Sequence, residues 1–122
     1  MKIENVAVVG ASSKEGRYSH QAMLLIEESG HNPIPVAPAQ QEILGKKAYP
    51  ALSAIPGRVD TVTMYVRPSL QTSILDDAVS IKPYRIIFNP GTENPGEYDR
   101  LRNAGIEVIE ACTLILLRTN QF

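Results

Sequence analysis

The chain has a single cysteine, no tryptophan and almost no net charge, and each scarcity excludes a class of function. Cys112 is the one cysteine among 122 residues, which excludes an internal disulfide and a zinc site built from cysteines. A formal net charge of −1 gives no positive field that would hold a nucleic acid backbone. Without tryptophan, stacking surfaces for single-stranded nucleic acid are also missing. We therefore expect no nucleic acid partner.

Long hydrophobic runs are missing too. No apolar run, that from Leu114 to Leu117 included, is long enough to span a bilayer, and no apolar signal segment begins the chain. A hydrophobic fraction of 43% and a charged fraction of 20% are typical of a folded protein with its own core. We expect one cytoplasmic domain over residues 1–122 that makes no membrane contact.

The stretch from Val6 to Gly10 is the clearest structural signal in the chain. Its small and β-branched residues predict a strand that is buried on both faces, as in the middle of a parallel sheet. A loop containing Gly16 follows, and helical periodicity begins after Ser19. A strand, a glycine-containing turn and a helix direct free backbone N–H groups and the positive end of a helix dipole at an anion. The stretch predicts a site for a phosphate-bearing ligand.

Strand-like and helix-like segments alternate through the rest of the chain. Further strands are predicted at 31–36, 59–66, 85–88 and 106–109, with helices beginning near Ser19, Ser69, Asn94 and Thr113. Together these elements predict a three-layer, doubly wound α/β fold of Rossmann type with a five-stranded parallel sheet.

Two local patterns refine this prediction. Pro33 and Pro35 leave the second strand either frayed or paired on one side only, since proline cannot donate to a central ladder. Asn94, Pro95 and Glu97 have the spacing of a capping box at the start of a helix.

Ligands of such sheets bind outside the carboxyl ends of the strands, and the loops there decide the class of ligand. Gly10 and Gly16 lack the three-glycine spacing of a dinucleotide fingerprint, and Val36 to Pro38 hold no acidic residue for a ribose hydroxyl. A Walker-type Gly-Lys-Ser/Thr sequence is also missing. The sequence disfavours NAD, while adenosine and pyrophosphate stay candidates.

A series of short motifs in these loops and strands covers nearly the whole chain, from Val6 to about Thr113. They are Val8-Val9-Gly10-Ala11-Ser12, Arg17 and Ser19, Pro35-Val36-x-Pro38, Ile43-x-Gly45, Tyr49-Pro50-x-Leu52, Ile55-Pro56, Val59-Asp60, Asn89-Pro90-Gly91-x-Glu93 and Ala111-Cys112-Thr113-Leu114. In order and spacing they resemble the small stand-alone CoA-binding proteins, which are similar to the CoA-binding domain of the succinyl-CoA synthetase alpha subunit. Ala37 departs from the pattern, because many relatives have asparagine there.

The resemblance implies that CoA or an acyl-CoA is the ligand, and it implies a role for each loop. The backbone amides of Ala11, Ser12 and Ser13, after Gly10, would hold the pyrophosphate, helped by both serine hydroxyls. Arg17 would contact a phosphate oxygen. The remaining implied contacts are Val36 and Pro38 beside the adenine, Lys46 at the ribose phosphate, Val66, Arg67 and Pro68 along the pantetheine arm, and Asn89 and Gly91 near its far end.

Several of these residues also have a purely structural interpretation. Gly10 serves a tight turn in any case, Lys46 is typical of an exposed lysine, and Asn89 is as suited to holding a turn through its amide. Arg67 could instead pair with Asp60 or Asp76. Two further residues matter less: His20 and His31 have no metal-like spacing, so surface or helix-start roles are expected for them.

Nothing in the sequence forms a nucleophile–base pair, a metal cluster or a paired-carboxylate site, so we predict no catalytic and no metal-binding residue. The expected function is a non-catalytic module that binds CoA or an acyl-CoA. The alternatives are a subunit of an acyl-CoA-processing enzyme whose catalytic groups come from a partner chain, and a nucleotide-binding domain.

The apolar tail, with Leu114 to Leu117 and Phe122, leaves a homodimer or a partner protein open. Cys112 is either a buried structural residue or a thiol able to exchange with that of CoA.

Overall fold

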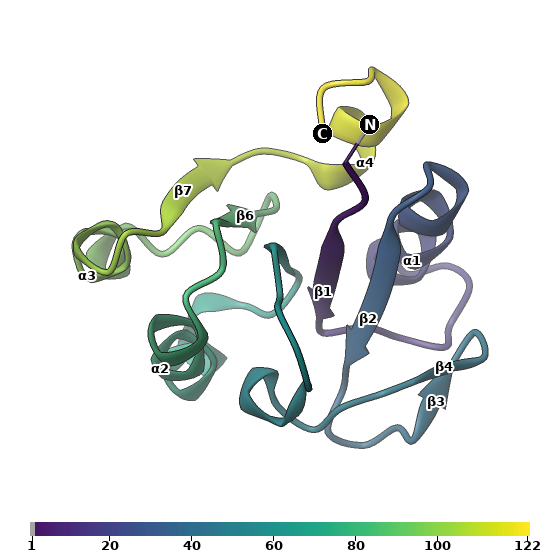
Figure 1. Ribbon diagram of the computed structural model, residues 1–122, viewed down its shortest axis with the longest axis horizontal. Coiled ribbons are helices and arrows are strands. Elements are labelled where there is room, and N and C mark those ends of the chain that lie inside the picture. The colour runs from purple at the N-terminus through teal and green to yellow at the C-terminus, as the bar shows by residue number, and fades with distance from the viewer. Residues whose placement is uncertain (1) are drawn as a thin grey trace.

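A five-stranded parallel sheet between two layers of helices forms the centre of the computed structural model, which describes residues 2–122 (Figure 1). Its strands run in the spatial order β2-β1-β5-β6-β7. Their bounds are β1 Asn5–Val9, β2 Asn32–Val36, β5 Thr61–Met64, β6 Arg85–Phe88 and β7 Glu107–Glu110. The predicted Rossmann-like α/β architecture is therefore confirmed.

Helices cover both faces of this sheet. Helices α1 (Tyr18–Glu28) and α4 (Thr113–Arg118) lie on one side, and α2 (Thr72–Ile81) and α3 (Tyr98–Asn103) lie on the other (Figure 1). The connections contain three short 3₁₀ turns and a small antiparallel hairpin. These are η1 Leu52–Ala54, η2 Pro68–Leu70, η3 Pro95–Glu97, and the strands β3 Glu42–Ile43 and β4 Lys46–Lys47.

Burial on both faces explains the continuous apolar run of β1. Val6 and Val8 pack with α1 and α4, whereas Ala7 and Val9 pack in the core under α2 and α3. All four are at most 2% exposed. Because successive side chains of a strand point to opposite faces, a strand with helices on both sides needs apolar residues at every position.

The strand order creates an opening at the carboxyl edge of the sheet. The chain passes from β1 to β2 on one side and then returns to β5 on the other side of β1. Connections therefore leave β1 and β5 in opposite directions, which is the point where ligands of doubly wound sheets bind. The loops after β1, β2, β5 and β6 all meet there.

Several predictions of local structure are confirmed and others are wrong. β2 is an edge strand, as its two prolines required. The hairpin β3–β4 was not expected, because two-residue strands carry no periodicity. Helix α1 is preceded by Arg17 rather than capped by Ser19, and α2 begins after Gln71 rather than Ser69.

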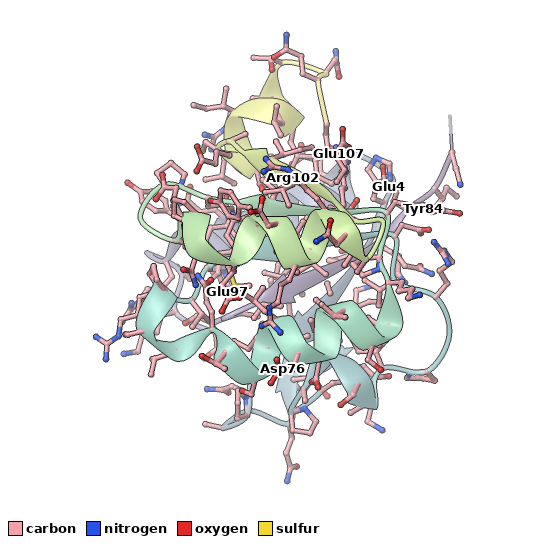
Figure 2. The ribbon with its side chains drawn as sticks, turned by 90° about the vertical axis from the view of Figure 1, so that its left-hand side faces the viewer. Glu4, Asp76, Tyr84, Glu97, Arg102 and Glu107 are labelled. Carbon is pink, nitrogen blue, oxygen red and sulfur yellow. The ribbon has the colours of Figure 1, made fainter. Side chains whose placement is uncertain are left out.

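The capping box predicted at Asn94 is not formed. The Asn94 side chain donates to Gln71 Oε1 at 3.1 Å, and Glu97 accepts from Arg100 Nε at 2.7 Å. Arg100 Nη1 also lies 2.7 Å from Asp76 of α2, so one guanidinium joins α3 to α2. Figure 2 shows these two helices side by side, with Asp76 and Glu97 near their facing sides. The Asn94 side chain is therefore bound by a distant residue, and Glu97 by a residue three positions further along the chain.

Gly10 is the residue on which the turn after β1 depends, and its replacement gives a first prediction. Its φ is +89°, and an added Cβ would lie 3.0 Å from Val66 Cγ2. Gly10→Ala should therefore lower the free energy of unfolding by about 1–3 kcal/mol, through the disfavoured φ and the close contact.

Gly16→Ala is the matched control, because no atom lies within 4 Å of the added Cβ and its φ is not positive. Its effect should stay within about 0.5 kcal/mol. Urea unfolding of both variants checks the pair, and equal stabilities would contradict the role given to Gly10.

Candidate functional site

Three pockets lie along the carboxyl edge of the sheet and share lining residues. The loop pocket, about 240 Å³, is lined by Gly10, Ser12, Arg17, Tyr18, Ser19, Tyr65, Pro90 and Thr92. The α2-side pocket, about 350 Å³, is lined by Val9, Gly10, Val36, Pro38, Pro50, Ala51, Leu52, Val66, Leu70, Ser73, Ile74 and Asp77. The α4-side pocket, about 370 Å³, is lined by Tyr18, Tyr65, Asn89, Pro90, Cys112, Leu114, Ile115 and Arg118.

The loop after β1 carries backbone donors without partners beside the loop pocket, which Ser12 lines and Ser13 and Gly16 do not. Gly10 N and Ala11 N both donate to Val36 O, at 3.0 and 3.3 Å. The amide of Ala11 therefore has an acceptor within the protein, and its contact with the pyrophosphate stays a prediction. The amides of Ser12, Ser13 and Gly16 have no hydrogen-bond partner within residues 2–122. Helix α1 begins directly after them, so its positive end lies at the same place.

The side chain of His20 holds the loop after β1 through a hydrogen bond. Its side chain is only 5% exposed, and Nδ1 lies 2.9 Å from Ser12 O. Because a carbonyl oxygen only accepts, Nδ1 carries the proton in this contact. Of the two roles expected for His20, the helix-start role is found, because it lies in the first turn of α1; a surface position is not, because the side chain is buried. The histidine is a support of the loop that the sequence did not reveal.

Two arginines at this edge are exposed and differ in position. Arg17 lines the loop pocket and forms no ion pair with another described residue. Arg67 is likewise unpaired within residues 2–122, because Asp60 pairs with Arg58 at 3.7 Å and Asp76 with Arg100. Neither alternative pairing expected for Arg67 is therefore formed. Arg67 does not line any of the three pockets named above.

The remaining predicted residues are distributed unevenly. Val36, Pro38 and Val66 meet in the α2-side pocket. Pro68 lies outside the three pockets, at the start of η2. Lys46, in the hairpin, pairs instead with Glu27 of α1 at 2.6 Å. Val66, which was expected along the pantetheine arm, therefore lies in the same pocket as the two residues expected beside the adenine.

Asn89 is held in a buried hydrogen-bond network and has little left to offer a ligand. Its Nδ2 donates to Thr63 Oγ1 at 2.8 Å and to Met64 O at 2.9 Å, and its Oδ1 accepts from Thr113 N at 2.8 Å. Only 3% of the residue is exposed. The structural interpretation of Asn89 therefore accounts for its contacts. Gly91, exposed with φ +93°, donates its N–H to Glu93 Oε1 at 2.8 Å.

Gln71 joins two of the ligand-edge loops and was not predicted. It is fully buried, and its Nε2 donates to Val66 O at 2.7 Å and to Thr92 O at 2.8 Å. Asn94 Nδ2 donates to its Oε1. The loop after β5 is thereby tied to the loop after β6. A glutamine before a helix carries no signal of such a role.

Tyr65 is a second residue that the sequence did not bring forward, although it stands at the end of a predicted strand. It lines both the loop pocket and the α4-side pocket. The hydroxyl is buried and makes no hydrogen bond of normal geometry within the described residues, and burial raises the pKa of Tyr65 to about 12. The ring therefore stays neutral over the physiological range.

Groups for metal or redox chemistry are few at this edge. Residues 2–122 contain no group of three or more His, Cys, Asp or Glu side chains placed to hold a metal ion. In the same range no helix is long and apolar enough to cross a membrane. Cys112 is a half-buried free thiol that lines the α4-side pocket.

Comparisons with known proteins bear on what this edge binds. The family model for the CoA binding domain matches residues 4–118. A protein of Bacillus subtilis (strain 168), uncharacterized protein YneT, is 29% identical over 106 residues, which are 87% of this chain and 78% of YneT. The crystal structure of another uncharacterized protein is 38% identical, with TM-score 0.92 and complete coverage of both chains.

A larger protein contains a similar domain. The dinucleotide forming acetyl-coenzyme A synthetase 1 of Ca. Korarchaeum cryptofilum, in complex with phosphate and ADP, matches with TM-score 0.77 and 22% identity. The match covers 88% of this chain and 25% of that one. At this identity the likeness shows the fold alone.

Replacing Asn89 tests whether its side chain stabilises the fold, as its hydrogen bonds indicate, or serves only to contact a ligand. Asn89→Leu leaves the Thr113 amide and the Met64 carbonyl unsatisfied in a buried site, at a cost of about 1–3 kcal/mol for each group. The free energy of unfolding should therefore fall by at least about 2 kcal/mol, measured by urea unfolding without ligand. The exposed Asn103→Leu is the control and should change it by about 0.5 kcal/mol or less. A stable Asn89→Leu protein would contradict the network.

Burial of two tyrosines predicts an alkaline loss of stability. Burial raises the pKa of Tyr65 to about 12, and burial with the hydrogen bond to Glu110 raises that of Tyr98 to about 12. Unfolded tyrosine titrates near pH ~10, so the folded state binds more protons above that pH and stability falls between pH ~10 and ~12.

Chemical unfolding at a series of alkaline pH values checks this expectation. Tyr65→Phe and Tyr98→Phe should each reduce the loss, while Tyr84→Phe, at a residue that is 54% exposed, should leave it unchanged. An equal loss in all three variants would show that the two buried phenols are not its source.

Proposed function

The chain belongs to the CoA-binding domain family, and from this premise we propose that it binds CoA or an acyl-CoA at the carboxyl edge of its sheet, as a module without catalytic groups of its own. The family supports CoA binding in general. The observation that carries the finer proposal is the order of the three pockets. The loop pocket, which is the most polar of them and is lined by Ser12 with an amide unpartnered within residues 2–122, lies between two largely apolar ones. CoA has the same order, with a pyrophosphate between adenosine and pantetheine.

The pyrophosphate is assigned to the loop pocket. Ser12 and Ser13 would donate their backbone N–H groups, and the first turn of α1 would add its dipole. Arg17 supports this assignment because its guanidinium lines the pocket, carries no carboxylate partner within residues 2–122, and matches phosphate geometry. Gly91 would lie near the arm that leaves the pyrophosphate.

The adenine is assigned to the α2-side pocket. Val36, Pro38 and Val66 give it flat apolar walls, and Ser73 and Asp77 are polar residues of its lining that could meet the edge of the base. Lys46 and Arg67 would reach the ribose phosphate and the pantetheine arm only by moving from their present positions, Lys46 by leaving Glu27. We therefore rest the proposal on the pockets and not on these two side chains.

The absence of catalytic activity is part of the proposal. Within residues 2–122, the three pockets contain one carboxylate, Asp77, one thiol, Cys112, and no histidine. A nucleophile needs an adjacent base, and no hydroxyl or thiol of these lining residues is hydrogen-bonded to a carboxylate or imidazole within the described residues; Asp77 accepts from Ser53 N and not from Ser73. A partner chain that supplied the missing groups would turn the module into an enzyme subunit, and copurification of a second polypeptide would reveal it.

Ligand-induced stabilisation tests the proposal. CoA and acetyl-CoA should raise the free energy of unfolding by about 3–4 kcal/mol at concentrations hundreds of times their dissociation constants, whereas NAD, NADP and ATP should not. Calorimetric titration should show about a 10- to 100-fold weaker CoA affinity for Arg17→Ala, because a charge-assisted contact is worth about 1.5–3 kcal/mol.

Arg102→Ala is the matched control, because Arg102 lies on α3, on the face shown in Figure 2, and lines none of the three pockets. Its CoA affinity should equal that of the unmodified protein. Stabilisation by NAD in place of CoA, or an Arg17→Ala variant that binds CoA unchanged, would overturn the assignment.

A further inference from the structure

A single carboxylate lies in the otherwise apolar lining of the α2-side pocket. Among the described residues, Asp77 is the one charged member of this lining, and Ser73 is the one other member with a polar side chain. Aliphatic and proline side chains make up most of the wall, chiefly Val36, Pro38, Leu52, Val66, Leu70 and Ile74. A charged group in apolar surroundings is costly unless a hydrogen-bond donor meets it. The position of Asp77 therefore indicates that a donor enters the pocket.

The fold itself supplies no strong donor to Asp77. Its Oδ2 accepts from Ser53 N at 3.4 Å, which is long for a hydrogen bond, and the residue forms no ion pair within residues 2–122. The preceding residue, Asp76, pairs by contrast with Arg100 of α3 at 2.7 Å. Asp77 is half-buried, and its second carboxylate oxygen, Oδ1, is left for a ligand.

A carboxylate at this place selects among the parts of CoA. It repels phosphate groups and accepts hydrogen bonds from N–H groups. CoA has N–H groups in the amino group of its adenine and in the amides of its pantetheine arm. The flat apolar walls made by Val36, Pro38 and Val66 suit a planar ring better than a flexible chain. The adenine amino group is therefore the donor that fits beside Asp77.

Ser73 adds a second polar contact on the same side of the pocket. It precedes Asp77 by one turn of α2, so both side chains lie on one face of the helix and both line the pocket. In adenine, the amino group is a donor beside an acceptor, the ring nitrogen N7. A carboxylate beside a hydroxyl offers the complementary pattern of acceptor and donor. Guanine has two acceptors on that edge, O6 and N7, and would set O6 against the carboxylate.

We propose that Asp77 is a specificity-determining residue, which accepts a hydrogen bond from the exocyclic amino group of adenine and so favours a 6-aminopurine over a 6-oxopurine. The inference rests on the proposed function, because the pyrophosphate must be held at the loop pocket for the base to reach α2. It goes beyond that function, since binding of CoA as such does not require that the two classes of purine be distinguished.

Calorimetric titration with CoA and with deamino-CoA, in which hypoxanthine replaces adenine, tests the inference. The two ligands share every other group and have nearly the same shape. The unmodified protein should bind CoA at least about 10-fold more tightly, because the amino group donates to the carboxylate, whereas the oxygen of hypoxanthine faces it without a proton.

Asp77→Asn is the decisive variant. It keeps the size of the side chain, removes the charge, and adds an N–H group that can donate to the oxygen of hypoxanthine. Its preference for CoA should therefore fall to about threefold or less. Asp99→Asn is the matched control, at an exposed aspartate of α3 that lines none of the three pockets, and it should keep the full preference. Urea unfolding without ligand should give both variants the midpoint of the unmodified protein.

The outcomes separate the two proposals. If neither CoA nor deamino-CoA binds, the proposed function and this inference fail together. If both ligands bind with equal affinity, or if Asp77→Asn keeps the full preference for CoA, the inference alone is overturned. An Asp77→Asn protein that loses the same factor of affinity for both ligands would show that the carboxylate supports the pocket without contacting the amino group, and would also overturn it. A preference that is lost in Asp77→Asn and kept in Asp99→Asn supports the inference.

Discussion

The carbonyl oxygen of Val36 holds the turn on which the carboxyl edge of the sheet depends. Two successive amides, those of Gly10 and Ala11, donate to it, so the end of β1 is fastened to the end of β2. Only a residue without a Cβ fits at the start of this turn, because φ is +89° and Val66 approaches from β5. After this turn the amides of Ser12 and Ser13 have no partner within residues 2–122, and α1 begins a few residues later.

This arrangement explains how an ordinary α/β core presents a site with three chemically different parts. The α2 side and the α4 side of the sheet each supply apolar walls, because each face already needs apolar side chains for its own core. Between them, the loop leaves the amides of Ser12 and Ser13 without partners within the described residues, and Arg17 follows in the same loop. Two buried side-chain amides stabilise the structure around the site. Gln71 joins the loops after β5 and β6, and Asn89 joins the end of β6 to β5 and to the start of α4. The proposed ligand contacts and the supporting contacts are therefore made by different groups.

Much of the fold was predictable from the sequence. The buried run of β1, the edge position implied by Pro33 and Pro35, and the exact bounds of β6 follow from periodicity and from the geometry of proline. Helix caps were predicted poorly. Asn94 binds the distant Gln71, which no local pattern specifies, and Glu97 pairs with Arg100 three residues on in place of the capping contact.

The site was predictable only in part. Arg17, Val36 and Pro38 could be placed at the edge because loops at the carboxyl ends of strands must meet there. The roles of His20 and Gln71, and the walls made by Tyr18 and Tyr65, depend on which way each side chain turns in three dimensions. A sequence pattern gives no such direction for a single polar residue.

The central claim is that backbone N–H groups just after the turn at Gly10 hold the pyrophosphate of CoA. A titration of the ¹⁵N-labelled protein with CoA, followed through its amide resonances, tests it most directly. The account predicts the largest downfield changes at the amides of Ser12 and Ser13, which have no partner within residues 2–122, since a phosphate oxygen gives each its first strong acceptor. Saturable CoA binding that leaves these two resonances in place would contradict it.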